Sequence, residues 1–271
     1  MRNSDRCRRE PAALARRARP ALACRARHPR ARGTVVASLA LGIALSATTL
    51  PACAQSTVDP AARVAALRAR LASVETRTAR VADVDALENL QGSYGYYTDK
   101  MLWDEVLDLF ADDGTLEIGP SGVYVGKDSI RRYLLSLSSG KQGPLEGVLY
   151  EHFQLQPIVT VAPDGQTAKA RWRAFLMTGV YGSGSGGNWG EGTYENEYVK
   201  QNGVWKIKKL HWYTTFIAPY EGGWLNASKK LVDDYALGRG VTPDRPPSEA
   251  YDAYPGVYVP PFHYKNPVSG E

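Results

Sequence analysis

Two tyrosines and an aspartate occur in one predicted helix, at a spacing that could support chemistry. Tyr94 and Tyr97 belong to an apolar series that steps by three and four residues, and Asp99 follows near the end of the same stretch. Such steps place side chains on one side of a helix. A face that carries phenols and ends in a carboxylate can line a small-molecule pocket, or it can be ordinary core. The series is Leu87, Leu90, Tyr94, Tyr97 and Met101.

A histidine lies on a predicted strand further along the chain. His152 alternates with Gln154 and Gln156 over the predicted strand 147–161, so these three side chains share one strand face. Polar side chains in that arrangement either meet solvent or line a cavity with polar tips. A structural or exposed role for the histidine therefore stands beside a catalytic one.

Three later polar residues are further candidates. Asn196 lies on a predicted strand and can orient a ligand or act as an ordinary strand residue. His211 shares a strand face with Tyr213, and both can reach the mouth of a cavity. His263, in the C-terminal tail, is expected to be exposed. Trp205 and Ile207 are predicted core residues.

Cysteine chemistry is excluded for the main part of the chain. Cys7, Cys24 and Cys53 all lie within residues 1–54, so the remainder has no disulfide, thiolate nucleophile or cysteine zinc site. No HExxH, strand-following GxGxxG or GxxxxGK[ST] motif occurs. We therefore expect neither a metal nor another cofactor.

The first 54 residues have the composition of a leader. They carry a net charge of +9, and an uncharged stretch at 34–50 precedes Pro51-Ala52-Cys53-Ala54. A basic region, an apolar region and small residues at a cut site are typical of a signal peptide. Cleavage after Ala54 predicts a bacterial periplasmic protein. Cleavage before Cys53 would leave a lipidated N-terminus, and a membrane partner is expected only in that case.

The charge balance argues against nucleic acid as a partner. The whole chain has a formal charge of +5, but the portion after residue 54 has a charge of −4. The predicted mature protein is therefore mildly acidic, which does not suit a phosphate backbone.

The remaining sequence predicts an α+β domain. Residues 55–81 form a spacer helix, packed against nothing or against a short coiled-coil partner, and a central helix starts at Asp83 or Asp85. Two further helices are predicted near 103–110 and 127–137. The predicted strands are 115–118, 123–125, 147–161, 167–181, 194–200 and 204–216. Three hairpins after three helices favour a curved antiparallel sheet.

The C-terminal residues 219–271 are rich in proline and aromatic side chains. Such a tail has too many aromatic residues for a typical disordered linker. We expect it to wrap the domain, to cover a pocket mouth, or to embrace a second subunit.

Several local strings resemble the SnoaL-like branch of the nuclear transport factor 2-like superfamily over roughly residues 82–218. They are YGYYTD at 94–99, WDEVLDLFADDG at 103–114, YVGKDSI at 124–130, EHF at 151–153 and GVWKI at 203–207. The resemblance implies a cone-shaped α+β barrel, in which three N-terminal helices pack in the bent sheet around an apolar cavity. The superfamily includes dehydratases, cyclases, isomerases, dehydrochlorinases, epoxide hydrolases and binding modules, so fold alone does not define function.

The resemblance also implies site residues. In dehydratase-like members a helix tyrosine, a carboxylate five residues later and a strand histidine meet in the cavity, which assigns catalysis to Tyr94, Asp99 and His152. Asp99 would orient His152, which would move a proton next to a carbonyl or hydroxyl carbon, and Tyr94 would stabilise the oxyanion. The predicted substrate-binding residues are Tyr97, Trp103, Gln154, Asn196 and His211.

The predicted function is therefore cofactor-independent dehydration or isomerisation of a hydrophobic, oxygenated small molecule. The alternative is a periplasmic binding or scaffold module without chemistry. In both cases we expect a homo-oligomer, a dimer or a trimer.

Overall fold

One long helix starts the part of the chain that the structure describes. The computed structural model describes residues 59–184, 186–237 and 240–271, so the predicted leader lies outside it. Helix α1 (Pro60–Asp99) has 40 residues, and the carboxyl group of Asp59 accepts a hydrogen bond from the backbone of Ala61 at its start. The prediction that a separate helix starts at Asp83 or Asp85 is wrong, because no proline or glycine interrupts residues 75–91 and α1 continues through them.

Asp83 anchors the middle of α1 instead of starting a helix. Its Oδ1 atom accepts hydrogen bonds from Lys200 Nζ at 2.5 Å and from Trp205 Nε1 at 2.8 Å. Burial alone would raise the pKa of Asp83, but these two partners outweigh it, and the pKa is lowered. One carboxylate thus ties the helix to two strands of the sheet.

We expect Asp83→Ala to lower the free energy of unfolding by about 2 kcal/mol, because it leaves a half-buried ammonium and an indole N–H without their acceptor. Urea denaturation at pH 7 measures this loss. Asp85→Ala is the matched control, since Asp85 is exposed and holds only the amide of Asn89 at 3.3 Å. Equal losses in the two variants would show that Asp83 is not an anchor.

Short elements follow α1 and form one edge of the sheet. They are α2 (Trp103–Leu109), β1 (Phe110–Ile118), the 3-10 turn η1 (Gly119–Ser121), β2 (Val123–Val125) and α3 (Gly126–Ser136). Helix α3 lies where a helix near 127–137 was predicted, and Ile130, Tyr133 and Leu134 form its buried stripe. The predicted strand 115–118 is the second half of β1.

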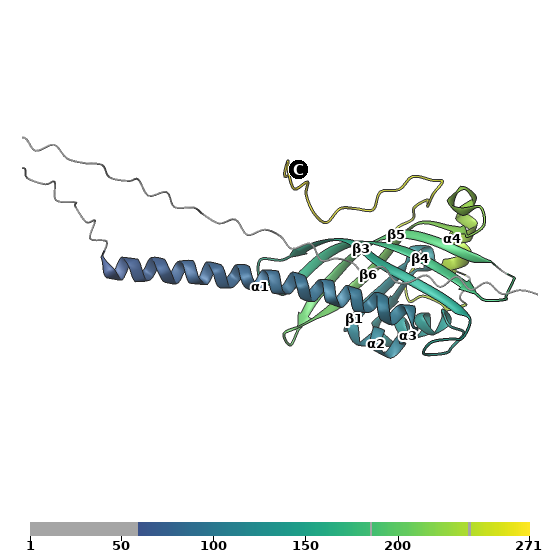
Figure 1. Ribbon diagram of the computed structural model, residues 1–271, viewed down its shortest axis with the longest axis horizontal. Helices are drawn as coiled ribbons and strands as arrows, with labels where there is room; N and C mark the ends of the chain where they lie inside the picture. The colour runs from purple at the N-terminus through teal and green to yellow at the C-terminus, as the bar shows by residue number, and fades with distance from the viewer. Residues whose placement is uncertain (1–58, 185, 238–239) are drawn as a thin grey trace, which may run out of the picture. The chain divides into compact units, whose positions relative to one another are not determined.

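Four long strands complete a six-stranded sheet. They are β3 (Val148–Val161), β4 (Thr167–Val180), β5 (Gly187–Gln201) and β6 (Val204–Pro219), and the strand order is β2-β1-β6-β5-β4-β3. The predicted fold class is confirmed: helices and a curved sheet form a cone-like α+β domain (Figure 1). Two details differ from the prediction, because β1 pairs with β6 in parallel and the sheet does not close.

The sheet has an inner face, which packs on α1, and an outer face. The inner face carries Trp172, Tyr194, Tyr198 and Trp212, each almost fully buried. Trp205 and Ile207 are core residues, as predicted. Because side chains alternate along a strand, the neighbours of these residues belong to the outer face.

The C-terminal tail packs on the outer face. After η2 (Gly223–Asn226) and α4 (Lys229–Leu237), an extended segment pairs with the sheet at Val123↔Arg245, and the backbone N–H of Tyr254 donates to the carbonyl of Thr215 at 2.7 Å. Arg171 donates from its guanidinium to the carbonyls of Pro260 and Pro261. Of the predicted positions for the tail, wrapping the domain is the one observed.

None of the described helices is both long enough and apolar enough to cross a membrane.

Candidate active site around His152

The imidazole of His152 is enclosed between α1 and the sheet. His152 lies on β3 and is only 5% exposed. Its Nε2 atom is 3.1 Å from the hydroxyl of Tyr194, while Nδ1 is buried and has no hydrogen-bond partner among the described residues. Burial lowers the pKa of His152 to about 4. The ring is therefore neutral at pH 7 and keeps one nitrogen available.

Aromatic side chains surround this imidazole. The ring centroids of Tyr94, Tyr150, Tyr194 and Trp212 lie between 5.8 and 6.4 Å from that of His152. The rings of Tyr94 and Tyr194 also meet edge to face, with centroids 6.0 Å apart. Burial raises the pKa of Tyr94 to about 12 and raises that of Tyr194. Both phenols thus stay protonated at neutral pH and can donate.

Asp99 lies at the C-terminal end of α1, beside the backbone of His152. Burial raises the pKa of Asp99 to about 6, with a further contribution from the nearby Glu151, although the backbone N–H of His152 acts in the opposite direction. The Oδ1 atom of Asp99 is buried without a partner in the described residues. The structure therefore leaves one oxygen of Asp99 and one nitrogen of His152 unpaired in the same region.

The three predicted catalytic residues occupy one neighbourhood, but the contacts differ from those expected. Tyr94 packs against the ring of His152, whereas Asp99 meets the backbone of His152 and not its imidazole. The hydrogen-bond partner of the ring, at Nε2, is the hydroxyl of Tyr194.

A cleft reaches Asp99 from the surface. It has a volume of about 250 Å³, lies between α1 and β3, and its wall includes Tyr96, Asp99, Phe153 and Leu155. A second cleft, of about 530 Å³, contains none of the predicted site residues. The first cleft gives the carboxyl group of Asp99 a path for proton exchange with water.

Two predicted binding residues belong to a buried polar network. The amide of Asn196 donates to the side-chain oxygen of Gln91 at 3.0 Å, and the amide of Gln91 donates to Gln154 at 2.8 Å. The hydroxyl of Tyr198 donates to the same oxygen of Gln91 at 2.8 Å. This network joins α1 to β3 and β5, so Asn196 and Gln154 hold the frame of the site.

Two others pack in the helical layer. Trp103 is fully buried, and its Nε1 donates to the hydroxyl of Ser138 at 3.0 Å. Tyr97 is half-buried against the core. The structure gives Trp103 a scaffold contact at the start of α2, and it places Tyr97 one turn from Tyr94.

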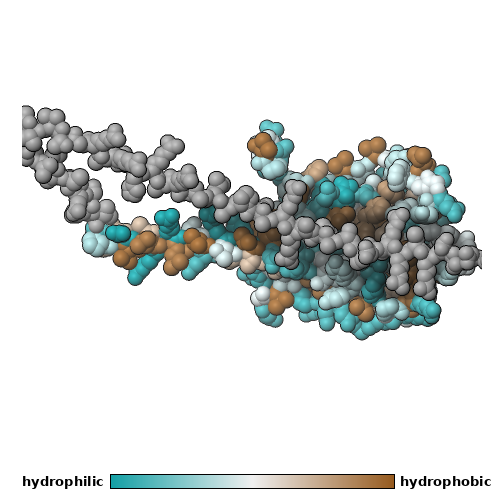
Figure 2. All heavy atoms as spheres, in the orientation of Figure 1, coloured by the Kyte–Doolittle hydropathy of each residue, from teal (hydrophilic) through white to brown (hydrophobic). Residues whose placement is uncertain are grey.

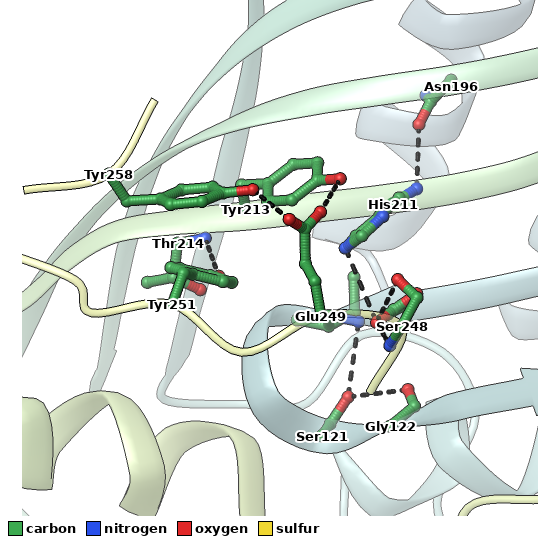
Figure 3. Close-up of polar contacts among 12 residues, drawn as sticks. Ser121, Gly122, Asn196, His211, Tyr213, Thr214, Ser248, Glu249, Tyr251 and Tyr258 are labelled. Atoms are coloured by element: carbon green, nitrogen blue, oxygen red, sulfur yellow. Dashed lines mark hydrogen bonds and ion pairs between the residues drawn. The ribbon is translucent and has the colours of Figure 1, made fainter. Parts of the chain in front are cut away.

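His211 lies on the outer face, away from His152. It is buried, its Nε2 atom is 3.6 Å from Oε1 of Glu117, and burial lowers its pKa to about 3. Glu117 accepts hydrogen bonds from the backbone and hydroxyl of Ser248 in the tail (Figure 3). The predicted role of His211 at the cavity mouth is wrong, because His211 lies on the outer face and the tail covers it there.

Other contacts between the outer face and the tail involve tyrosines and a histidine. Tyr213 and Tyr258 donate their hydroxyl protons to the carboxylate of Glu249, one from the sheet and one from the tail (Figure 3). The expectation that His263 is exposed is wrong. Its side chain is 5% exposed, and its Nδ1 is 2.9 Å from Glu195.

Close contact between α1 and β3 depends on a glycine. A methyl group added to Gly95 would lie 2.9 Å from Cγ of Gln154 and 3.3 Å from the carbonyl oxygen of His152, whereas one added to Gly92 would meet nothing within 4 Å. Only Gly95 therefore permits the approach of the strand that carries His152.

We expect Gly92→Ala to stabilise the protein by about 0.5–1 kcal/mol through helix propensity, and Gly95→Ala to destabilise it by about 1 kcal/mol because crowding exceeds that gain. Thermal unfolding of the two variants side by side measures the difference. Stabilisation by both substitutions would contradict the close approach at Gly95.

Sequence reasoning missed Tyr194, the residue that binds the imidazole. The signal was present in the string YENEY at 194–198, where Tyr194, Asn196 and Tyr198 alternate with two glutamates. Such alternation assigns the tyrosines to one face of a strand and the carboxylates to the other. The strand also starts earlier than predicted, at Gly187.

Among the described residues, no group of three or more His, Cys, Asp or Glu side chains is arranged to hold a metal ion.

Similar solved structures include enzymes and a protein of unknown function. Hexachlorocyclohexane dehydrochlorinase LinA type 3 from Novosphingobium barchaimii LL02 is 17% identical, with 54% of this chain and 95% of that chain covered and a TM-score of 0.47. Hexachlorocyclohexane dehydrochlorinase LinA type 2 is 20% identical, with 53% of this chain and 92% of that chain covered and a TM-score of 0.45. A protein of unknown function from Mycobacterium tuberculosis is 16% identical, with 63% of this chain and 95% of that chain covered and a TM-score of 0.49. A comparison with curated proteins gives no match.

The family model described as a SnoaL-like domain matches residues 79–211, which span the second half of α1 and the strands up to His211. This range contains Tyr94, Asp99, His152 and Tyr194. The matched residues and the observed α+β fold together identify the chain as a member of the SnoaL-like family within the nuclear transport factor 2-like superfamily.

Proposed function

We propose that this protein binds a hydrophobic, oxygenated small molecule beside His152 and catalyses its dehydration or isomerisation without a cofactor. The observation that carries the proposal is a buried neutral imidazole with an unpaired nitrogen, placed between protonated phenols and a carboxyl group whose pKa is raised. Unpaired buried polar atoms cost about 1–3 kcal/mol each, so a bound group that satisfies them is favoured.

His152 is the proposed base. In a dehydration, Nδ1 of His152 takes a proton from the carbon next to a carbonyl or hydroxyl carbon, and the electron pair of the broken C–H bond forms the new double bond. The leaving hydroxide takes the phenolic proton of Tyr94 and departs as water. In an isomerisation, the same phenol stabilises the enolate oxygen until the proton returns to carbon.

Tyr194 closes the proton cycle. Its hydroxyl lies 3.1 Å from Nε2 of His152, and its ring packs against that of Tyr94. The imidazolium gives its Nε2 proton to the oxygen of Tyr194, and the proton of Tyr194 passes to the phenolate of Tyr94. All three groups regain their starting charges, while the imidazole proton now lies on Nδ1. Exchange of that proton with water through Asp99 and the cleft, and return of a proton to Nε2, restores the starting tautomer.

Asp99 makes His152 basic enough for this step. A buried imidazole with a pKa near 4 is a weak base at pH 7. Rotation of the Asp99 carboxylate from the backbone N–H of His152 toward Nδ1 would place a negative charge beside the developing imidazolium, which favours protonation. The neighbouring cleft returns protons to solvent.

Access to His152 requires movement of the aromatic rings around it. The hydroxyls of Tyr150 and Tyr235 are 3.1 Å apart, and Tyr235 of α4 also packs on Trp212. Among the elements that touch this cluster, α4 is a short helix outside the residues of the matched SnoaL-like domain. Displacement of α4 is therefore the proposed route for a ligand.

The test combines ligand-induced stabilisation with turnover. A panel of hydroxylated and ketonic ring compounds is screened by thermal shift, and each stabilising compound is followed for water loss or double-bond migration. We expect turnover by the unaltered protein and by His263→Asn, a buried histidine on the outer face, and a loss of at least 100-fold in His152→Asn. Equal stabilisation of all three proteins without turnover would instead support a binding module.

Export is a separate proposal that rests on the sequence of residues 1–54. A basic region, an apolar stretch and small residues before position 55 are consistent with cleavage and a periplasmic location, with lipidation at Cys53 as the variant form.

A further inference from the structure

The first half of α1 extends past the sheet and carries an apolar stripe. Every residue from 60 to 82 is exposed. At about 1.5 Å per residue this part is roughly 35 Å long. In Figure 2 it shows apolar side chains among hydrophilic ones. The stripe is Val64, Leu67, Leu71, Val74 and Val81, whose exposed fractions run from 47% to 69%.

The stripe is not a continuation of the face that packs on the sheet. The buried residues of α1 are Leu87, Gln91, Tyr94, Gly95 and Thr98. At about 100° per residue, the mean direction of the stripe differs from that of the buried face by about 150°. The domain's own sheet therefore cannot cover the stripe, and a straight helix presents it to another molecule.

The spacing of the apolar residues indicates that the molecule covering the stripe is a second helix. The stripe steps by three, four and three residues and resumes seven residues after Val74, with Thr78 at the intervening position. This is the heptad pattern of a two-helix seam, with Val64, Leu71 and Thr78 at a positions and the others at d positions. A helix that lies on a membrane needs a wider apolar face, usually with large aromatic anchors, and residues 60–82 contain none.

Charges beside the seam favour a parallel partner of the same sequence. In a parallel pair, Arg70 at g meets Glu75 at e of the second copy, which gives two attractive contacts. The like-charged pair, Arg63 with Arg68, falls near the first turn, where the helix end frays. An antiparallel pair would have the same number of attractive contacts, from Arg68 to Glu75, but it would place Arg70 against Arg77 in the middle of the seam, where fraying cannot relieve the repulsion. Arg63 belongs to the first turn, since its backbone N–H donates the first helical hydrogen bond, to the carbonyl of Asp59.

We propose that residues 60–82 form a parallel, two-stranded coiled coil with a second copy of this chain. The coil joins two SnoaL-like domains at their α1 ends and does not depend on the proposed chemistry. The coiled coil covers the exposed apolar stripe. Because its two helices are parallel, both SnoaL-like domains lie at the same end of it.

The test uses the full chain. Sedimentation equilibrium compares the unaltered protein with Leu67→Glu/Leu71→Glu, which places charges in the seam, and with Ala66→Glu/Ala69→Glu, which places the same charges on the opposite side. We expect the seam variant to raise the dimer dissociation constant at least 100-fold, and the control to change it less than threefold. Far-UV circular dichroism checks that all three proteins keep their fold.

Direction is tested by oxidation of Leu67→Cys. A parallel seam brings the two introduced thiols together, so a peptide linked through position 67 of both copies is expected by mass spectrometry, and Ala69→Cys is expected to give none. A monomeric unaltered protein, a seam variant that dimerises as well as the control, or stripe-dependent binding to anionic vesicles without dimerisation would each overturn the proposal. Equal linking at positions 67 and 69 would do the same for the parallel seam.

Discussion

Lowering the pH from 7 to 4 is expected to destabilise the protein through His152, by about 3 kcal/mol from this residue alone. Burial lowers the pKa of the folded-state imidazole from 6.5 to about 4. Between these values the unfolded chain binds a proton that the folded chain does not, so stability falls as the pH falls through this window. Below pH 4 both states are protonated and the loss is complete.

The measurement is urea denaturation of the unaltered protein and of His152→Phe at intervals from pH 7 to pH 4. Other groups, including Asp99 with its raised pKa, titrate in both proteins, so the difference between the two curves isolates His152. Tyr194→Phe is the control, because it removes the ring's hydrogen-bond partner and keeps the imidazole. Parallel curves for the unaltered protein and His152→Phe would mean that His152 is not buried as a neutral ring.

Asp99→Asn is expected to lower turnover by about 100- to 1,000-fold, the range for loss of an acid–base group. Since burial, aided by Glu151, raises the pKa of Asp99 to about 6, the carboxylate is present above this pH and lost below it. Turnover by the unaltered protein should therefore rise with pH through about 6. The amide variant should lack this rise while keeping its stability at pH 7, because it removes a buried charge.

Glu151→Gln is the matched variant for this prediction. It removes a negative charge that raises the pKa of Asp99, so the rise in turnover should move to lower pH with its amplitude retained. Activity profiles measured on any compound that the panel identifies test both variants. An unchanged profile in Asp99→Asn would remove Asp99 from the proposed chemistry.

Local patterns predicted most of the fold. The steps of three and four residues before Asp99, the helix near 127–137 and the paired strands 194–200 and 204–216 each depend on residues close in sequence, and the structure has a helix or strand at each of these places. Two boundaries were wrong for physical reasons. Asp83 has the chemistry of a helix cap, but Trp205 and Lys200 recruit it from over 100 residues away. The start of β5 contains glycines that local propensity assigns to a loop.

The site was predictable in position but not in its contacts. A tyrosine, a carboxylate and a histidine could be assigned through family resemblance, and the structure places them in one region. The hydrogen bond between Tyr194 and His152 joins residues 42 positions apart. The burial of His263 depends on a tail that returns to Glu195. Spacing along the chain carries no information about such pairs, because they form only when the strands and the tail assemble.

The central claim is that His152 moves a proton on a bound small molecule. Hydrogen–deuterium exchange at carbon, followed by NMR in D₂O, tests it most directly, because reversible proton removal labels a ligand even when no net product accumulates. With cyclic ketones that stabilise the protein in the thermal-shift screen, the account predicts deuterium at the carbon next to the carbonyl, formed by the unaltered protein and not by His152→Asn. Ligands that bind and stay unlabelled, or equal labelling by His152→Asn, would contradict it.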